Sequence, residues 1–180
     1  SITKIIQNYG NKLKKYLPSI VSGFGAGVLQ IVPILKGLAC CLIVPAASYA
    51  AVLLHKKSNK ISKIDYKTGL VIGLLTGIFA AVFGSFFEII ITFITKQNDV
   101  TGSFNQIQQM LSTLPITPEL RQEVLDMIAG VNNDIAMYGF STLYTISIIM
   151  NNFIVNTIFG MVGGLIAVKF IDSKEKRDSE

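Results

Sequence analysis

One carboxylate stands alone inside a long apolar stretch, and it is the first residue of this chain that could do chemistry. Glu88 is the one charged residue between Thr68 and Thr95. An acid placed within a bilayer can bind a cation or relay a proton, so it is a candidate functional site. Glu88 precedes Lys96 by roughly 12 Å at 1.5 Å per residue, close to the end of the stretch. We therefore expect an interfacial or structural role, with ion or proton handling and an inter-subunit hydrogen bond as alternatives.

Side-chain amides form the second group of candidates. Asn151, Asn152 and Asn156 lie in the stretch 139–168, which contains no charged residue, and Gln30 lies in an earlier apolar stretch. Asn152 and Asn156 are four residues apart, so they share one face of a helix. Amides inside a membrane usually join helices, at about 0.6–2 kcal/mol each. We expect these four amides to act in packing; contact with a solute or a cofactor is the alternative.

The remaining reactive residue types do not form a catalytic pattern. The sequence has no HExxH, no GxSxG, no Walker loop and no paired carboxylates in its apolar stretches. The single histidine, His55, precedes Lys56 and Lys57, a setting typical of a lipid-headgroup neighbour; a haem or pigment ligand is the alternative. Cys40 and Cys41 are adjacent, which matches neither a metal spacing nor a disulfide framework. We predict a protein that is not an enzyme, without catalytic residues, metal or cofactor, and with bound lipid as its expected ligand.

Four apolar stretches must position these side chains. About 20 apolar residues cross the ~30 Å hydrocarbon core of a bilayer, and the stretches 68–95 and 139–171 exceed this length. The stretches 19–35 and 38–54 lie near the lower limit for a span, and Lys36-Gly37 between them predicts a tight helical hairpin. Pro33 and Pro45 interrupt helical hydrogen bonding in this pair. A re-entrant pair that never emerges on the far side is therefore the alternative to two full crossings.

The N-terminal segment 1–17 is amphipathic. Its apolar residues follow the 3.6-residue period of a helix, and lysines occupy other positions. This pattern predicts a helix in the membrane interface, with its lysines near anionic headgroups; packing on the protein's own spans is the alternative. We expect Pro18 to separate this helix from the first span.

The connection 96–138 is expected to be an external helical segment. It contains two amphipathic pieces, and the second has clear helix boundaries: Thr117 as the N-cap, Pro118 at the first helical position and Gly130 at the end. Together with the stretches above, this predicts an all-α integral membrane protein in a single domain, 1–180, with about four transmembrane helices.

The distribution of Lys and Arg predicts which side is cytoplasmic. The net charge of +5 does not point to nucleic acid, because the lysines flank apolar runs without stacking aromatics between them. With four spans, the two terminal segments and the connection 55–67 lie on one side and carry 13 Lys and Arg, against three on the other. Positive residues favour the cytoplasmic side. Both termini are therefore predicted in the cytoplasm of a multi-pass protein, and 96–138 outside.

Glycines recur every four residues along three of the apolar stretches. Such small-xxx-small faces let helix backbones approach closely, which supplies the dispersion energy that joins helices in lipid. We expect them to be helix-packing positions, within the chain or against another subunit. They are Gly23 and Gly27 in the first stretch, Gly69, Gly73 and Gly77 in the third, and Gly160 and Gly164 in the last.

The order of these parts resembles a known kind of protein. The hairpin VPILKGLACCLIVPAASYAAVLLHKK, the third stretch IDYKTGLVIGLLTGIFAAVFG and the end FGMVGGLIAVKF resemble uncharacterised small bacterial four-span membrane proteins. That resemblance implies an architecture and a bacterial inner membrane, and no mechanism. We predict a non-catalytic accessory or structural subunit of a larger membrane complex, with lipid and other membrane subunits as partners. The alternative is a small transporter or channel that uses Glu88 and the amides Asn151, Asn152 and Asn156.

Overall fold

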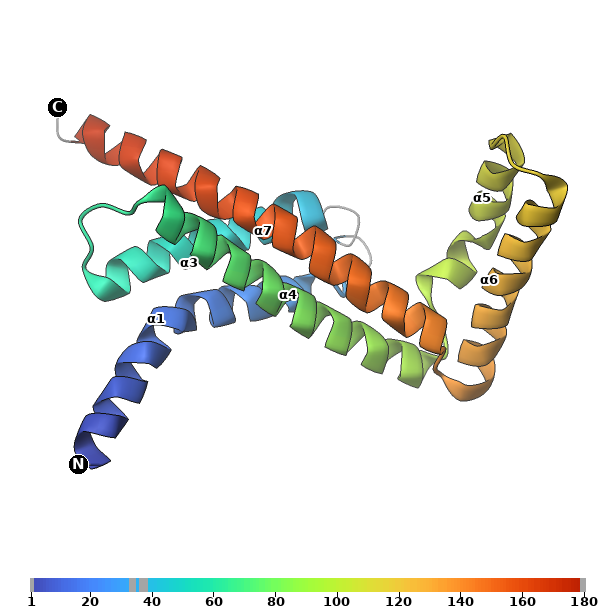
Figure 1. Ribbon diagram of the computed structural model, residues 1–180, viewed down its shortest axis with the longest axis horizontal. Helices are drawn as coiled ribbons and strands as arrows, with labels where there is room; N and C mark the ends of the chain where they lie inside the picture. The colour runs from blue at the N-terminus through green and yellow to red at the C-terminus, as the bar shows by residue number, and fades with distance from the viewer. Residues whose placement is uncertain (1, 33–34, 36–38, 179–180) are drawn as a thin grey trace. The chain divides into compact units, whose positions relative to one another are not determined.

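The protein is helical throughout the part that the structure describes. The computed structural model describes residues 2–32, 35 and 39–178, and these form six α-helices and one π-helix without strands (Figure 1). The predicted all-α fold is confirmed over these residues. Among the described helices, two are long and apolar enough to cross a membrane: α4 (Tyr66–Thr95) and the part Thr142–Lys174 of α7 (Thr142–Asp178).

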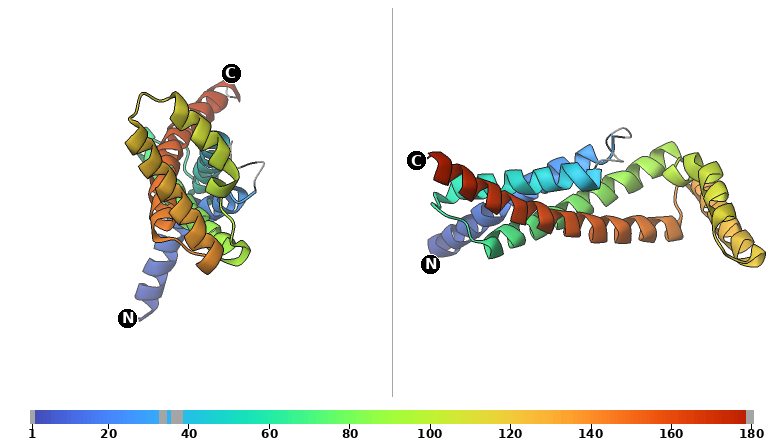
Figure 2. Two further views of the ribbon diagram at one scale, coloured as in Figure 1. Left: turned by 90° about the vertical axis from the view of Figure 1, so that its right-hand side faces the viewer. Right: turned by 90° about the horizontal axis from the view of Figure 1, so that it is seen from above.

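The chain divides into two compact units. The first comprises Ser1–Phe87 and Ile149–Glu180, and the second comprises Glu88–Ile148. In the first unit α4 and α7 run side by side, together with α1 (Ile2–Leu29) and α3 (Val44–Asn59) (Figures 1 and 2). A core of buried aliphatic residues joins α3, α4 and α7, including Val52, Ile72 and Val168.

Helix α1 continues through Pro18, so the predicted break between an interfacial helix and the first span is wrong. A proline inside a helix removes one hydrogen bond, and it can bend the helix without ending it when packing holds the adjacent turn. Ser19 provides such packing, since its buried hydroxyl donates to the Ile72 carbonyl oxygen of α4 at 3.3 Å. Figure 1 shows α1 changing direction along its length.

The first apolar helix is shorter than its apolar stretch. α1 ends at Leu29, before the predicted end at residue 35, and residues 30–32 form turns. A proline at position 33 lacks the N–H that would continue the helical pattern. The apolar part of α1, Tyr16–Leu29, covers roughly 20 Å at 1.5 Å per residue, less than the ~30 Å of a bilayer core.

The second apolar stretch begins as a π-helix, η1 (Ala39–Ile43), and continues as α3. Pro45 stands in the first turn of α3, where its missing N–H costs no helical hydrogen bond. The helix ends at a left-handed Lys60, whose N–H donates to the carbonyl oxygens of Lys56 and Lys57. The predicted hairpin at Lys36-Gly37 lies outside the described residues.

The N-terminus of α4 is held by Asp65. The Thr68 hydroxyl donates to the Asp65 carboxylate, and the Gly69 N–H donates to the Asp65 carbonyl oxygen at 3.1 Å. The hydrogen bond from Thr68 is the main reason why the pKa of Asp65 is below its ordinary value. Asp65 therefore remains an anion where α4 begins, at the end of the lysine-rich connection 55–67.

The second unit contains α5 (Asp99–Thr113) and α6 (Pro118–Tyr138), which lie side by side (Figure 2). The predicted start of α6 is confirmed: the Thr117 side chain accepts from the Leu120 N–H, and Pro118 is the first helical residue. The predicted end at Gly130 is wrong, because α6 continues to Tyr138 and ends at Gly139 with φ of 73°. Val131 and Ile135 explain the extension, since both pack in a core with residues of α7.

Candidate functional site

The glycines of α4 and α7 form a close helix contact in the first unit. Gly69, Gly73 and Gly77 face the backbone at Gly164, Gly160 and Asn156, respectively. A Cβ built on Gly160 would lie 2.5 Å from the Gly73 carbonyl oxygen, closer than real Cβ atoms come. The two backbones touch here, and no side chain fits between them.

The glycines of α1 make a similar contact with α4. A Cβ on Gly23 would lie 2.8 Å from the Thr76 carbonyl oxygen, and a Cβ on Gly27 would lie 2.9 Å from the Gly84 nitrogen. Phe24 packs edge-on against Phe83 beside this contact, with ring centroids 5.1 Å apart. The predicted glycine positions of all three stretches thus lie at helix contacts within the chain.

Two polar pairs cross between helices in the same unit. Asn156 of α7 donates from Nδ2 to Gln30 Oε1 at 3.2 Å, and Asn152 Nδ2 donates to Ser85 Oγ of α4 at 3.0 Å. Asn156 is 2% exposed and Ser85 is 4% exposed. These pairs connect the end of α1, the middle of α4 and the middle of α7. Figure 1 shows these helices converging in the first unit.

One hydrogen-bond donor of this amide cluster is unsatisfied. Gln30 Nε2 is buried and has no hydrogen-bond partner among the described residues. A buried N–H without a partner costs free energy comparable to a lost hydrogen bond, and in protein interiors an ordered water commonly fills this role. The amide of Gln30 is therefore the polar group of the cluster with capacity for a further ligand.

The other predicted polar residues do not belong to this cluster. Asn151 is exposed on α7, although it is next to Asn152 in sequence. Glu88 belongs to the second unit, where the Tyr144 hydroxyl donates to its Oε1 at 3.5 Å. Across the described residues no group of three or more His, Cys, Asp or Glu is placed to hold a metal ion.

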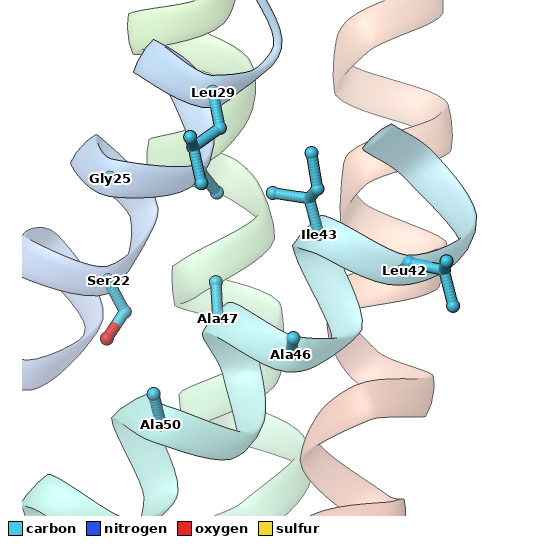
Figure 3. A pocket seen from close by; sticks show the side chains of 9 residues that line it. Ser22, Gly25, Leu29, Leu42, Ile43, Ala46, Ala47 and Ala50 are labelled. Atoms are coloured by element: carbon cyan, nitrogen blue, oxygen red, sulfur yellow. The ribbon is translucent and has the colours of Figure 1, made fainter. Parts of the chain in front are cut away.

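An apolar groove of about 460 Å³ lies between α1 and α3 in the first unit (Figure 3). Most of its wall consists of small residues, and the larger side chains of Leu29 and Ile43 lie toward each other across it. Leu42 also belongs to the lining. A Cβ on Gly25 would meet no atom within 4 Å, so the groove is open at this residue. The small residues of the wall are Ser22, Gly25, Ala26, Ala46, Ala47 and Ala50.

Comparison of this chain with protein-family models, with curated proteins and with solved structures finds no match.

Sequence reasoning missed two features of this unit. Gly163 contacts α3, because a Cβ there would lie 2.5 Å from the Pro45 Cα; the Gly163-Gly164 pair is the signal that could have indicated it. The groove was also missed. Its wall combines residues from α1, η1 and α3. Residue spacing within one helix does not indicate how two helices lie against each other.

Proposed function

We propose that this protein is a non-catalytic structural subunit of a larger complex in a bacterial cytoplasmic membrane. Helices α4 and α7 would cross the bilayer, and α1 and α3 would enter it as the shorter pair. The length and apolarity of α4 and α7 support this placement, and the distribution of lysines supports cytoplasmic termini.

The open groove between α1 and α3 is the observation that carries the proposal. Elsewhere in this unit the small residues are covered, since glycines of α4 meet α7 and glycines of α1 meet α4. In the groove Gly25 is half-buried and Ala46 and Ala50 are exposed, whereas Ala26 is buried. We assign the groove to an apolar helix of the partner subunit, because small side chains permit close backbone contact and Ser22 supplies a hydroxyl for an interhelical hydrogen bond.

The end of α1 favours an occupant that supplies packing and not hydrogen bonds. The N–H groups of Gln30, Ile31 and Val32 donate to the carbonyl oxygens of Ala26, Val28 and Leu29, so these backbone groups already have partners within the chain. An apolar helix fits this requirement, because its own backbone groups are bonded internally and it offers side chains for close packing.

The proposal is tested by purification from native membranes in mild detergent. We expect the wild-type chain to retain a stoichiometric larger membrane protein, and Gly25→Leu to release it while the chain itself stays folded. The added side chain fills the groove without meeting any atom of the chain within 4 Å at its Cβ. Gly102→Leu is the matched control, because Gly102 is also open but lies on α5. If both variants retain the larger membrane protein equally, the groove is not part of the interface with it.

The proposed orientation predicts a labelling pattern. After replacement of Cys40 and Cys41 by serine, a membrane-impermeant thiol reagent added outside should modify Ser103→Cys and spare Ser58→Cys. Ser58 lies near the end of α3 among the lysines that the proposal assigns to the cytoplasm, and Ser103 lies on α5, which the proposal assigns to the outside. Labelling of Ser58→Cys alone would reverse the topology.

A small transporter or channel is the second candidate, and the unpartnered Gln30 Nε2 favours it. A solute path would use Glu88 and the amides Asn151, Asn152 and Asn156. The pairing of Asn152 with Ser85 and of Asn156 with Gln30 favours packing instead. For the structural subunit we expect Glu88→Gln to leave assembly and ion flux in reconstituted vesicles near the wild-type level. Loss of flux with assembly intact would favour the transporter.

A further inference from the structure

A second, smaller pocket opens where α1, α3 and α4 meet near the lysine-rich connection. It has a volume of about 180 Å³ and is lined by Tyr16 of α1, His55 of α3, and Lys67, Thr68, Val71, Ile72 and Leu75 of α4. All of these residues belong to the first unit. The pocket is separate from the groove, with which it shares no lining residue.

The polarity of the pocket changes along α4. Lys67 and Thr68 lie in the first turn of the helix, and Val71, Ile72 and Leu75 follow at helical spacing on the same face. The distance from Lys67 to Leu75 along the axis is about 12 Å at 1.5 Å per residue. A ligand that fits this wall has a polar end beside Lys67 and an apolar body beside Val71 and Leu75.

His55 is a buried residue at the polar end of the pocket. Its side chain is 5% exposed although it lines the pocket. Asn59 lies one turn further along α3, with its Nδ2 3.4 Å from His55 Nδ1 and donating to the His55 carbonyl oxygen at 2.9 Å. When Asn59 donates to Nδ1, the hydrogen of a neutral ring is on Nε2. Tyr16 and Lys67 also line the pocket, and Lys67 supplies an ammonium group.

The charge around this end selects an anion. The connection from His55 to Lys67 contains five lysines and one acid, Asp65. The Asp65 carboxylate accepts from the Thr68 hydroxyl, so it is engaged at the start of α4. Lys67 is the one lysine of the five that lines the pocket, and it is exposed toward solvent.

We propose that this pocket binds an anionic membrane phospholipid, with its phosphate beside Lys67, His55 and Tyr16 and one acyl chain along Val71 and Leu75. The inference rests on the proposed membrane insertion, and it deepens the proposed function by naming a lipid that the subunit holds. A free phosphate would use the polar end alone, whereas the apolar wall extends about two turns beyond it. Basic pockets between helices on the cytoplasmic side are the usual sites for such headgroups.

The test is native mass spectrometry of the full chain in detergent, with added phosphatidylglycerol as the anionic probe and phosphatidylcholine as the zwitterionic one. We expect tighter binding of phosphatidylglycerol and a loss of about fivefold in its affinity for Lys67→Gln, the effect of one lysine at a lipid headgroup. Lys63→Gln is the matched control: it removes the same charge from the same connection, but Lys63 does not line the pocket. Equal effects of the two variants, or equal binding of the two lipids by the wild type, would overturn the proposal.

Glycerol phosphate distinguishes the lipid from a soluble phosphate, because it carries the headgroup chemistry without acyl chains. We expect millimolar glycerol phosphate to leave bound phosphatidylglycerol in place; displacement at that concentration would reject the lipid in favour of a soluble ligand. Circular dichroism of Lys67→Gln verifies that the helices are intact. If thiol labelling shows the predicted membrane sidedness and the lipid test fails, the lipid site alone is wrong. If the labelling fails, the membrane placement itself is wrong.

Discussion

Replacement of Gly73 by leucine should have the largest effect on this protein, a loss of folding free energy of about 3 kcal/mol or more. A side chain at this position would overlap the Gly160 carbonyl oxygen and approach the Gly164 Cα, and neither backbone atom can move without separating α4 from α7. We expect the variant to unfold at a lower fraction of sodium dodecyl sulfate when the helical signal is followed by circular dichroism in mixed micelles.

Gly25→Leu is the matched comparison for this prediction. The same substitution on α1 meets no atom within 4 Å at its Cβ, and leucine has the higher helix propensity by nearly 1 kcal/mol. Gly25→Leu should therefore unfold at the wild-type detergent fraction or slightly above it. Indistinguishable unfolding of the two variants would mean that the contact between α4 and α7 does not stabilise the protein.

Replacement of Asn156 by alanine should give the second largest effect, a loss of about 1–3 kcal/mol. Asn156 is almost fully buried and donates to Gln30 Oε1, while Gln30 Nε2 already has no partner in the described part of the chain. The variant would leave both polar atoms of the Gln30 side chain unsatisfied. Asn151→Ala, on an exposed position of the same helix, should change stability by less than about 0.5 kcal/mol.

A double variant separates this penalty from simple loss of packing. Gln30→Leu removes the amide that Asn156→Ala would leave without a partner. The double variant should therefore lose less folding free energy than the two single variants lose in sum. The same detergent titration measures all three. Strict additivity would show that the two amides do not interact.

The sequence predicted those features that depend on local chemistry or on helical period. Thr117 and Pro118 mark the start of α6 through a cap that involves only neighbouring residues. The bounds of α4 follow from a continuous apolar stretch, and the glycine spacing placed Gly73 and Gly160 on packing faces. The long apolar stretches and the helical period of the amphipathic segments together indicated an all-helical chain.

Features that depend on tertiary contacts were not predictable in this way. Gly130 predicted the end of α6, but the helix continues beyond it because Val131 and Ile135 are buried in a core. Pro18 predicted a break in the helix, but α1 continues through it, and the adjacent Ser19 hydroxyl is hydrogen-bonded to α4. The pairing of Gln30 with Asn156 joins residues 126 positions apart, and no spacing rule relates them.

The contact between α4 and α7 also limits how this protein can change during evolution. The nearest atoms to a side chain at Gly73, Gly77, Gly160 or Gly164 all belong to the backbone of the opposite helix. A second substitution can shorten a side chain, but it cannot shorten a backbone. A damaging change at these four positions therefore has no compensating partner across the contact, and a genetic suppressor screen should recover only reversions to glycine at the same codon.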